Sequence, residues 1–505
     1  MPSSTEATSE ASPTWIDDAR VSIVHTGLHD YCHTPPFHPP EAYPELGKTP
    51  VDPTNQVFRW VRESLRQLGL DRERFGTPEW NPLGQTVRPG MTVFIKPNTV
   101  SHAHLRGENV FSMITHGSVV RPLLDYVRIA LQGQGRIILG DSQYLFGDFD
   151  KAMAVTGMGA LVSWYRSQTP IPIECLDLRR LKAVRTWAGG NWGREAVPED
   201  ERGYRWVDLG RRSHFEGLDP ATLRIAVASP REMAKRHGPG RHEYQFPQVV
   251  LDCDAIVSVP KLKTHRRAAV SLTLKGFFGL VSHKDSLPHY RTGSPAEGGD
   301  EYIHPSFRKR LYSRLHDQVQ SRPLVLQKAV AAALRNAVWK TQAIWPLPDK
   351  VTEAMWYGND TIWRTILDIY LAVFFADRQG KLCETPQRNH FCLIDGIIGG
   401  QGNGPVEPDP VTPGVLVAGL NPAAIDAVAA TLMGFDVGRI PTVREALRQR
   451  LPEYEHILEV VEDGQALNLS ALAAGDTLGY EPHPEWIGRV ELAAVPSSQD
   501  QREDE

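Results

Sequence analysis

Polar and charged side chains follow four apolar segments of strand length, at the point where each strand would end. A lysine and an asparagine follow the strand predicted over 92–96, and an aspartate and a serine follow the one over 136–139. The strand predicted over 255–259 leads into a basic segment, and the one over 391–394 leads into an aspartate and a glycine-rich run. In open parallel sheets, ligands bind beyond the carboxyl ends of the strands. The four ends therefore predict one pocket, with the candidate residues Lys96, Asn98, Asp141, Ser142, Lys261, Lys263, Thr264, His265, Asp395, Gly402, Asn403 and Gly404.

The basic segment 261–265 carries the strongest functional signal. Its lysines and histidine are followed by two arginines, and so many cations repel one another unless an anion joins them. We expect Lys261 and Lys263 to hold a small carboxylate or phosphate. His265 is the expected proton carrier, because histidine titrates near neutrality and nearby lysines lower its pKa. Asp141 would orient these groups or hold a cation, and the alternative for the whole segment is a solvated basic turn.

Other signals are weaker because each has a purely structural explanation. Lys275 before a glycine could reach a ligand, but a lysine and a glycine also commonly end a helix. Asp141 and Ser142 could simply cap the helix that follows them. The glycine-rich run over 399–404 could cradle an anion with backbone N–H groups, yet it has neither the P-loop lysine nor the dinucleotide fingerprint.

The sequence does not decide whether the protein binds a metal ion or an organic cofactor. His102 and His104 have a spacing that could place two imidazoles on one divalent metal, with His116 as a third candidate. Histidines in polar loops are also often solvated or bonded to backbone. The five cysteines include no C-x-x-C pair, so we expect no iron–sulphur cluster.

Composition narrows the class of partner. The chain has 505 residues and a formal net charge of −5, which argues against a general nucleic-acid binder. The N-terminus lacks a signal-peptide pattern, and the most apolar stretch, 366–376, is too short to cross a bilayer and predicts a buried helix. We therefore expect a cytoplasmic protein with free thiols and no membrane partner. A homo-oligomer stays open.

The elements that position these residues follow an α/β pattern. Apolar runs alternate with helix-like segments, and the runs are continuous, as in strands buried on both faces. We predict mostly parallel, doubly wound sheets with helices on both faces. The predicted strands cover 21–24, 92–96, 136–139, 171–176, 255–259, 391–394 and 414–418. The predicted helices cover 55–68, 119–131, 151–166, 323–338, 361–375 and 422–433.

Two polar regions interrupt this alternation, and we interpret 182–248 and 282–358 as insertions that form lids or oligomer contacts. The remaining divisions are a disordered tail over 1–18, an N-terminal α/β part over 19–181, the basic-motif strand and turn over 249–281, a C-terminal α/β part over 359–495 and a second disordered tail over 496–505.

In the order and spacing of its motifs the chain resembles the DUF362 family. The resemblance rests on Phe94 to Asn98, Gly140 to Ser142, Pro260 to His265, Leu274 to Gly276 with Gly279, Asp395 with Gly396, Gly402 to Pro405 and Asn421 to Val428. Many relatives carry a ferredoxin-type iron–sulphur module, which this sequence lacks. The family name itself records an unknown function, so the resemblance supplies no mechanism.

Two functional hypotheses follow. The first is an enzyme, lyase-like or isomerase-like, that binds a small anionic substrate and performs acid–base chemistry such as isomerisation, elimination or hydration. The second is a cofactor-binding or metal-binding redox-accessory protein without turnover of its own.

Overall fold

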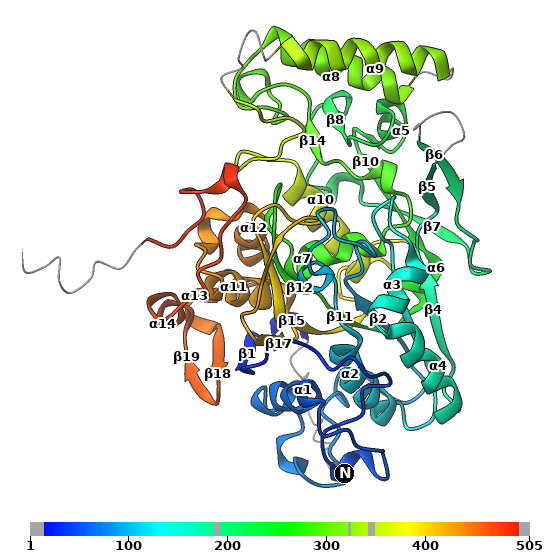
Figure 1. Cartoon of the computed structure of the whole chain (residues 1–505), viewed down its shortest axis with the longest axis vertical. Helices are drawn as coiled ribbons and strands as arrows, with labels where there is room; N and C mark the ends of the chain where they lie inside the picture. Colours follow the sequence, from blue (N-terminus) through cyan, green and yellow to red (C-terminus); the bar gives the residue numbers. More distant parts are fainter. Residues whose placement is uncertain (1–14, 186–191, 322–324, 342–348, 494–505) are drawn as a thin grey trace, which may run out of the picture.

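The computed structural model describes residues 15–185, 192–321, 325–341 and 349–493, and a 12-stranded sheet lies at its centre (Figure 1). The main path of this sheet runs in the order β19-β18-β1-β17-β15-β11-β2-β3-β4. Its strands are β1 (Arg20–His25), β2 (Thr92–Pro97), β3 (Arg136–Asp141), β4 (Ile173–Asp177), β11 (Ala255–Val259), β12 (Lys261–His265), β13 (Ala269–Val270), β15 (Asn389–Gln401), β16 (Asp409–Val411), β17 (Val415–Gly419), β18 (Glu459–Glu462) and β19 (Gln465–Leu467).

Most of the neighbouring strands run parallel. Strands β15, β11, β2, β3 and β4 form a continuous parallel set, whereas β17 is antiparallel to both β15 and β1. All residues of β11 and β17 are buried, which explains their continuous apolar sequences. The predicted mostly parallel α/β fold is confirmed.

Helices cover both faces of the sheet (Figure 1). On one face lie α1 (Gln56–Gln67), α2 (Gly117–Leu131), α3 (Phe149–Val155) and α4 (Met158–Gln168). On the other lie α7 (Leu272–Gly276), α10 (Ile362–Phe375), α11 (Pro422–Leu432) and α12 (Pro441–Arg450). The short helices α6 (Gln248–Asp252), α13 (Tyr454–Ile457) and α14 (Leu469–Ala474) complete the core part.

Of two helix predictions, the one over 151–166 is wrong and the one over 366–376 is confirmed. The single helix predicted over 151–166 is wrong, because the chain breaks between α3 and α4 at Gly157, whose φ is +72°. The apolar stretch 366–376 is the buried helix that was predicted, since it lies almost entirely in α10. No helix in the described ranges is long and apolar enough to cross a membrane.

The two polar regions stand outside the central sheet. The first contains β5 (Leu181–Arg185), β6 (Trp192–Ala196), β7 (Tyr204–Asp208), β8 (Leu223–Arg224), α5 (Pro230–Ala234), β9 (His237–Gly238) and β10 (Arg241–Pro247). The second contains β14 (Tyr290–Arg291) and the helical hairpin of α8 (Phe307–Ser321) and α9 (Val325–Lys340), at the top of Figure 1. Strand β14 pairs with β8 and thereby joins the two regions.

The predicted tails fall mostly outside the described residues, which begin at 15 and end at 493. Within the predicted tail 1–18, residues Trp15–Asp17 form a short 3-10 helix, and Trp15 is buried with its Nε1 donating to Arg388 O at 2.9 Å. Residues 15–17 therefore have regular structure although they lie within the predicted tail.

Candidate functional site

A cavity of about 230 Å³ lies beyond the carboxyl ends of β2 and β3. These two strands are parallel neighbours, so their ends meet at the same edge of the sheet. Seven predicted site residues line the cavity: Lys96, Asn98, Asp141, Ser142, Lys263, His265 and Lys275. Both insertions contribute a roof, which we define as Ile225, Ala226, Val227, Leu287, His289 and Glu353.

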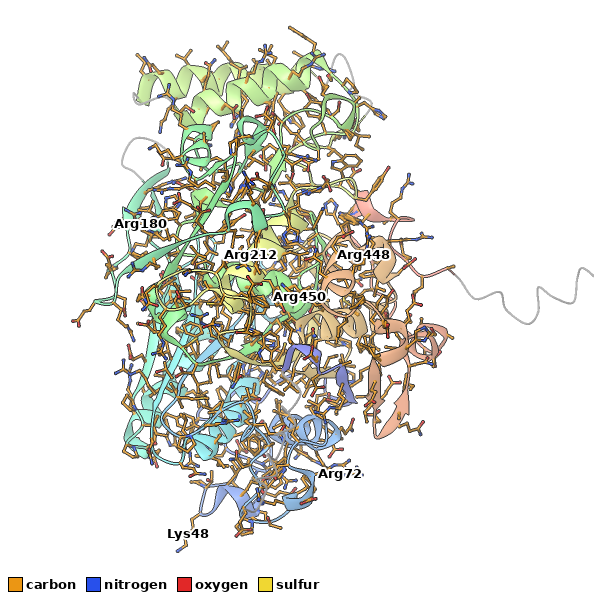
Figure 2. All side chains as sticks on the ribbon, turned by 180° about the vertical axis from the view of Figure 1, so that it is seen from behind. Lys48, Arg72, Arg180, Arg212, Arg448 and Arg450 are labelled. Carbon is orange, nitrogen blue, oxygen red and sulfur yellow. The ribbon has the colours of Figure 1, made fainter. Side chains whose placement is uncertain are left out.

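The cations of this cavity differ from those on the surface. Lys48 and Arg72 are exposed, and Figure 2 shows them projecting from the outside of the molecule. By contrast, Lys96 and Lys263 are only 4% and 1% exposed. The cavity lining includes six cationic side chains, from four lysines and two arginines, but only two carboxylates, Asp141 and Glu353.

Lys96 and Asp141 form an ion pair at the ends of two adjacent strands. Lys96 Nζ lies 2.8 Å from Asp141 Oδ1 and also donates to Pro97 O at 2.7 Å. Asp141 Oδ2 accepts from both N and Oγ1 of Thr99, at 2.7 and 2.9 Å. A Cβ at Gly279 would lie 2.0 Å from Asp141 Oδ1, so only glycine lets the backbone approach the pair this closely.

Ser142 presents an unused hydroxyl at the same edge. Its backbone N donates to Gly279 O at 2.7 Å, which fixes its position. Its Oγ is buried and has no hydrogen-bond partner among the described residues. Because buried polar atoms are normally hydrogen-bonded, this oxygen is suited to meet a ligand.

Lys263 comes from β12, which continues beyond β11 and pairs with the far half of β15. Its Nζ donates to Met113 O at 2.7 Å and to Pro405 O at 3.4 Å. No carboxylate contacts it among the described residues. Burial, together with the positive charges of Lys261 and Lys96, lowers the pKa of Lys263 to about 7.

His265 has a fixed tautomer. Its Nδ1 accepts from Arg267 N at 3.1 Å and from Ala268 N at 3.3 Å, so Nδ1 carries no proton and Nε2 does. Burial and the nearby Lys275, Arg267, Arg266 and Lys263 hold the pKa of His265 well below its usual value. His265 is therefore an uncharged imidazole that carries its proton on Nε2.

Lys275 lies in the last turn of α7, a short helix that Asp426 of α11 fixes at its start. Asp426 accepts from Thr273 N at 2.8 Å and Leu274 N at 2.9 Å. Lys275 Nζ lies 3.5 Å from the centroid of the Phe278 ring. The ring face stabilises an ammonium by about 1–2 kcal/mol. Burial and four neighbouring cations oppose this and hold the pKa of Lys275 well below its usual value.

Two cavity residues carried no sequence signal, because both lie in the second insertion. Lys284 Nζ donates to Ser142 O and Phe278 O, both at 2.9 Å, and burial lowers its pKa to about 7. His289 Nδ1 lies 2.8 Å from Leu287 O and must be the donor, which leaves Nε2 as an acceptor. Burial and the charges of Arg267 and Lys275 hold the pKa of His289 well below its usual value.

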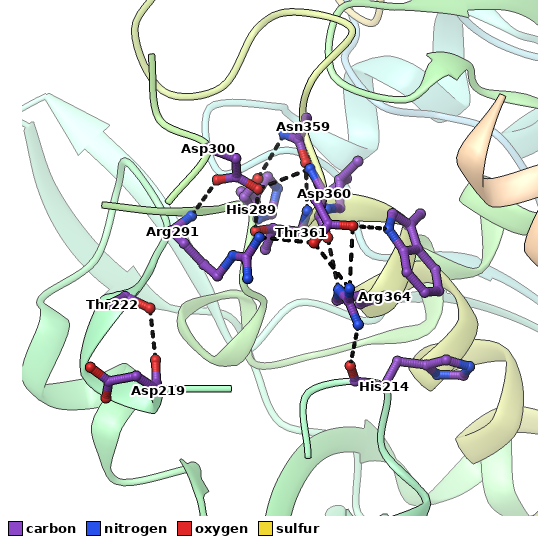
Figure 3. A network of polar contacts seen from close by, with 12 residues as sticks. His214, Asp219, Thr222, His289, Arg291, Asp300, Asn359, Asp360, Thr361 and Arg364 are labelled. Atoms are coloured by element: carbon purple, nitrogen blue, oxygen red, sulfur yellow. Dashed lines mark hydrogen bonds and ion pairs between the residues drawn. The ribbon is translucent and has the colours of Figure 1, made fainter. Parts of the chain in front are cut away.

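A polar network anchors His289, one of the roof residues (Figure 3). Asn359 Nδ2 donates to His289 O at 3.1 Å, and its Oδ1 accepts from Thr361 N at 3.0 Å. Asp300 accepts from Arg291 N at 2.6 Å and from Thr361 Oγ1 at 2.5 Å. The start of α10 is thereby tied to the insertion that carries His289.

Lys261 and Asp395 are brought together, but outside the cavity lining. Lys261 Nζ lies 2.9 Å from Asp395 Oδ2, and both side chains are fully buried. Tyr31 Oη donates to Asp395 Oδ1 at 2.7 Å and accepts from Lys261 Nζ at 2.6 Å. The expected convergence of Lys261 and Asp395 with the other site residues is therefore not observed.

The glycine-rich loop is hydrogen-bonded to β12 and to the residue that follows it. Thr264 Oγ1 donates to Gly402 O at 3.0 Å, and Arg266 N donates to Gly404 O at 3.2 Å. Asn403 Nδ2 donates to Glu407 Oε1 at 2.7 Å. Gly402, Asn403, Gly404 and Thr264 do not line the cavity.

The three candidate metal histidines have separate roles. His102 Nδ1 accepts from Asp148 N at 3.0 Å, and His104 Nε2 contacts Pro408 O at 2.9 Å. His116 stacks on Tyr31 with ring centroids 4.5 Å apart, and burial lowers its pKa to about 3. Within the described ranges, no group of three or more histidine, cysteine or acidic side chains is arranged to hold a metal ion.

Comparison with known proteins supports the family resemblance. Residues 217–431 match the family model described as "Domain of unknown function (DUF362)", which confirms the resemblance over that part of the chain. The match includes Lys263, His265, Lys275, Lys284 and His289, whereas Lys96 and Asp141 precede it. No curated protein and no solved structure matches the chain.

Proposed function

We propose that this protein is an enzyme that binds a small carboxylate or phosphate in the cavity and moves protons on it, as in an isomerisation, elimination or hydration. The observation that carries the proposal is the excess of basic groups, with six lysine and arginine side chains against two carboxylates around one buried cavity. All five cysteines are free thiols, in keeping with a cytoplasmic setting.

A bound anion would offset the repulsion between the basic side chains in this cavity. Buried like charges repel, so the lysines lose their protons or gain a counter-ion. The pKa values of Lys263 and Lys284 are both lowered to about 7, so each amine is partly protonated at neutral pH. A bound anion would favour the protonated form of both. The unused Ser142 Oγ offers a further hydrogen bond to such a ligand.

His265 and His289 have complementary roles, since one is a hydrogen-bond donor and the other a proton acceptor. The Nε2–H of His265 can donate to an oxygen that gains negative charge in the transition state. Nε2 of His289 has a free lone pair and can accept a proton from the substrate. We therefore assign proton transfer to His289, and stabilisation of the developing charge to His265.

Anion binding is tested first with the intact protein. Phosphate, citrate and pyruvate should each raise the melting temperature at pH 7 in a buffer without other multivalent anions. Lys263→Met should weaken this binding by about tenfold or more, since hydrogen bonds to charged groups contribute about 1.5–3 kcal/mol. Lys48→Met removes one exposed charge and is the matched control.

Proton transfer is tested by exchange in deuterated water. The substrates are a panel of hydroxy, oxo and unsaturated acids. In at least one of them we expect the wild-type protein to exchange a carbon-bound hydrogen near the carboxylate for deuterium, as measured by proton NMR. His289→Asn keeps a donor near the Nδ1 position and removes Nε2, so it should lose exchange while still binding the anion. A purified protein with a bound cofactor and no exchange on any acid would favour the redox-accessory alternative instead.

A further inference from the structure

We propose that Lys275 is a nucleophile that forms an imine with the carbonyl group of a small oxo acid bound in the cavity. This inference rests on the proposed function and names a substrate class for the same site: acids with a ketone or aldehyde group beside the anionic group.

The position of its amine sets Lys275 apart from the other cavity lysines. Lys96, Lys263 and Lys284 each donate to at least one backbone carbonyl, and Lys96 is also paired with Asp141. Within the described part of the chain, no hydrogen bond or ion pair engages Lys275 Nζ, which rests over the Phe278 ring. It is the cavity lysine whose nitrogen is free to react.

Its surroundings also favour the reactive form of the amine. A lysine attacks a carbonyl only when its nitrogen is unprotonated, and burial beside other cations produces that form at neutral pH. Lys284, Lys263, Arg267 and Lys96 all act on Lys275 in this direction. The same cations provide the countercharge for the carboxylate of an oxo acid.

The chemical step is balanced without an external oxidant or reductant. The Lys275 nitrogen lone pair attacks the carbonyl carbon and forms a C–N bond, while the C=O electron pair moves to oxygen. Proton transfers then release that oxygen as water and leave a protonated C=N bond. The resulting iminium acidifies the neighbouring C–H, whose proton can pass to Nε2 of His289.

The test uses reductive trapping on the full-length protein. Pyruvate and sodium cyanoborohydride are added at pH 7, and the intact mass and the tryptic peptides are measured. We expect one adduct per chain, with the mass of pyruvic acid less one oxygen atom, on the peptide that contains Lys275. Inorganic phosphate in excess should compete with the labelling, because both anions need the same cations.

The variants separate chemistry from folding and binding. Lys275→Arg places a permanent positive charge at this position and cannot form a stable imine, so labelling should fall by about tenfold or more while pyruvate still raises the melting temperature. Lys48→Met should label like the wild type. Circular dichroism of each variant checks that it is folded.

The possible outcomes distinguish this inference from the proposed function. Labelling at Lys275 that requires the folded protein supports the imine. Labelling of other lysines instead, or thermal stabilisation by pyruvate with no adduct from pyruvate or 2-oxoglutarate, overturns the imine and leaves the anion site standing. Absence of both stabilisation and adduct overturns the anion site as well.

Discussion

Lys261 and Lys263 belong to the same strand, two residues apart, but only Lys261 has a carboxylate partner. Lys261 is enclosed with Asp395 and Tyr31, and every polar atom of that cluster has a partner. Lys263 is just as buried, yet only backbone carbonyls contact its nitrogen, and it borders the cavity. Of these two lysines, the one with a carboxylate partner lies outside the cavity, whereas the one without such a partner borders the candidate site.

The largest expected effect tests the paired region. Lys261→Met leaves the Asp395 carboxylate buried without its cation and should lower the free energy of unfolding by about 3–5 kcal/mol. Urea denaturation measures this loss. The double variant Lys261→Met with Asp395→Leu should recover much of the stability, because both charges are removed together. A loss below about 1 kcal/mol in the single variant, typical of surface positions, would show that the pair is not structural.

The unpaired region should respond to pH instead. The pKa of Lys263 is about 7 in the folded protein and near its ordinary value of 10.5 when unfolded. Between these values the unfolded chain binds more protons, so the stability without anion should rise from pH 7 to pH 9, by up to about 3 kcal/mol for this group.

Lys263→Met should reduce this slope, because the titrating amine is gone. Urea denaturation at both pH values, in a buffer free of multivalent anions, measures the difference between the variant and the wild type. An equal slope in the two proteins would mean that Lys263 keeps its charge throughout and would contradict its assignment to the unpaired region.

The smallest effect concerns His265, which contributes to the stability of the fold and to the proposed anion binding. His265→Gln loses the acceptor for two backbone N–H groups and should cost about 1–2 kcal/mol of stability. His265→Asn keeps an acceptor near the Nδ1 position and loses the Nε2–H donor, so it should be nearly as stable as the wild type. Anion affinity, measured by calorimetry, should show the reverse order. Parallel losses of affinity and stability in both variants would assign His265 to structure alone.

The sequence predicted those parts of the fold and site that depend on local pattern. Continuous apolar runs revealed the buried strands. Of the side chains expected to converge from the strand ends, Lys96, Asp141, Ser142, Lys263 and His265 line one cavity, whereas Lys261 and Asp395 do not. Pattern could not reveal the register of β12 on β15. Between Lys261 and Lys263 the partner residue jumps from Asp395 to Gly400, and this irregularity separates the two lysines.

Residues of the insertion could not be assigned from sequence for a different reason. Lys284 and His289 belong to no strand-end motif, and contacts distant in the chain, such as the bond from Asn359 to His289 O, bring them over the cavity. The glycine-rich run has a packing reason for its glycines that the sequence pattern does not show. A Cβ at Gly404 would lie 2.1 Å from Thr264 O, so glycine is needed there without any ligand.

The contact of Gly279 with the Lys96 and Asp141 pair gives a rule for interpreting other sequences. A methyl group at this position would overlap Asp141 Oδ1 and the end of the Lys96 side chain, whose Nζ lies 2.5 Å from the Cβ position. With alanine or a larger residue here, the ends of both charged side chains would have to move from their present positions. Glycine at 279 is thus the residue to look for beside the lysine and the aspartate when another sequence is examined for this strand-end arrangement.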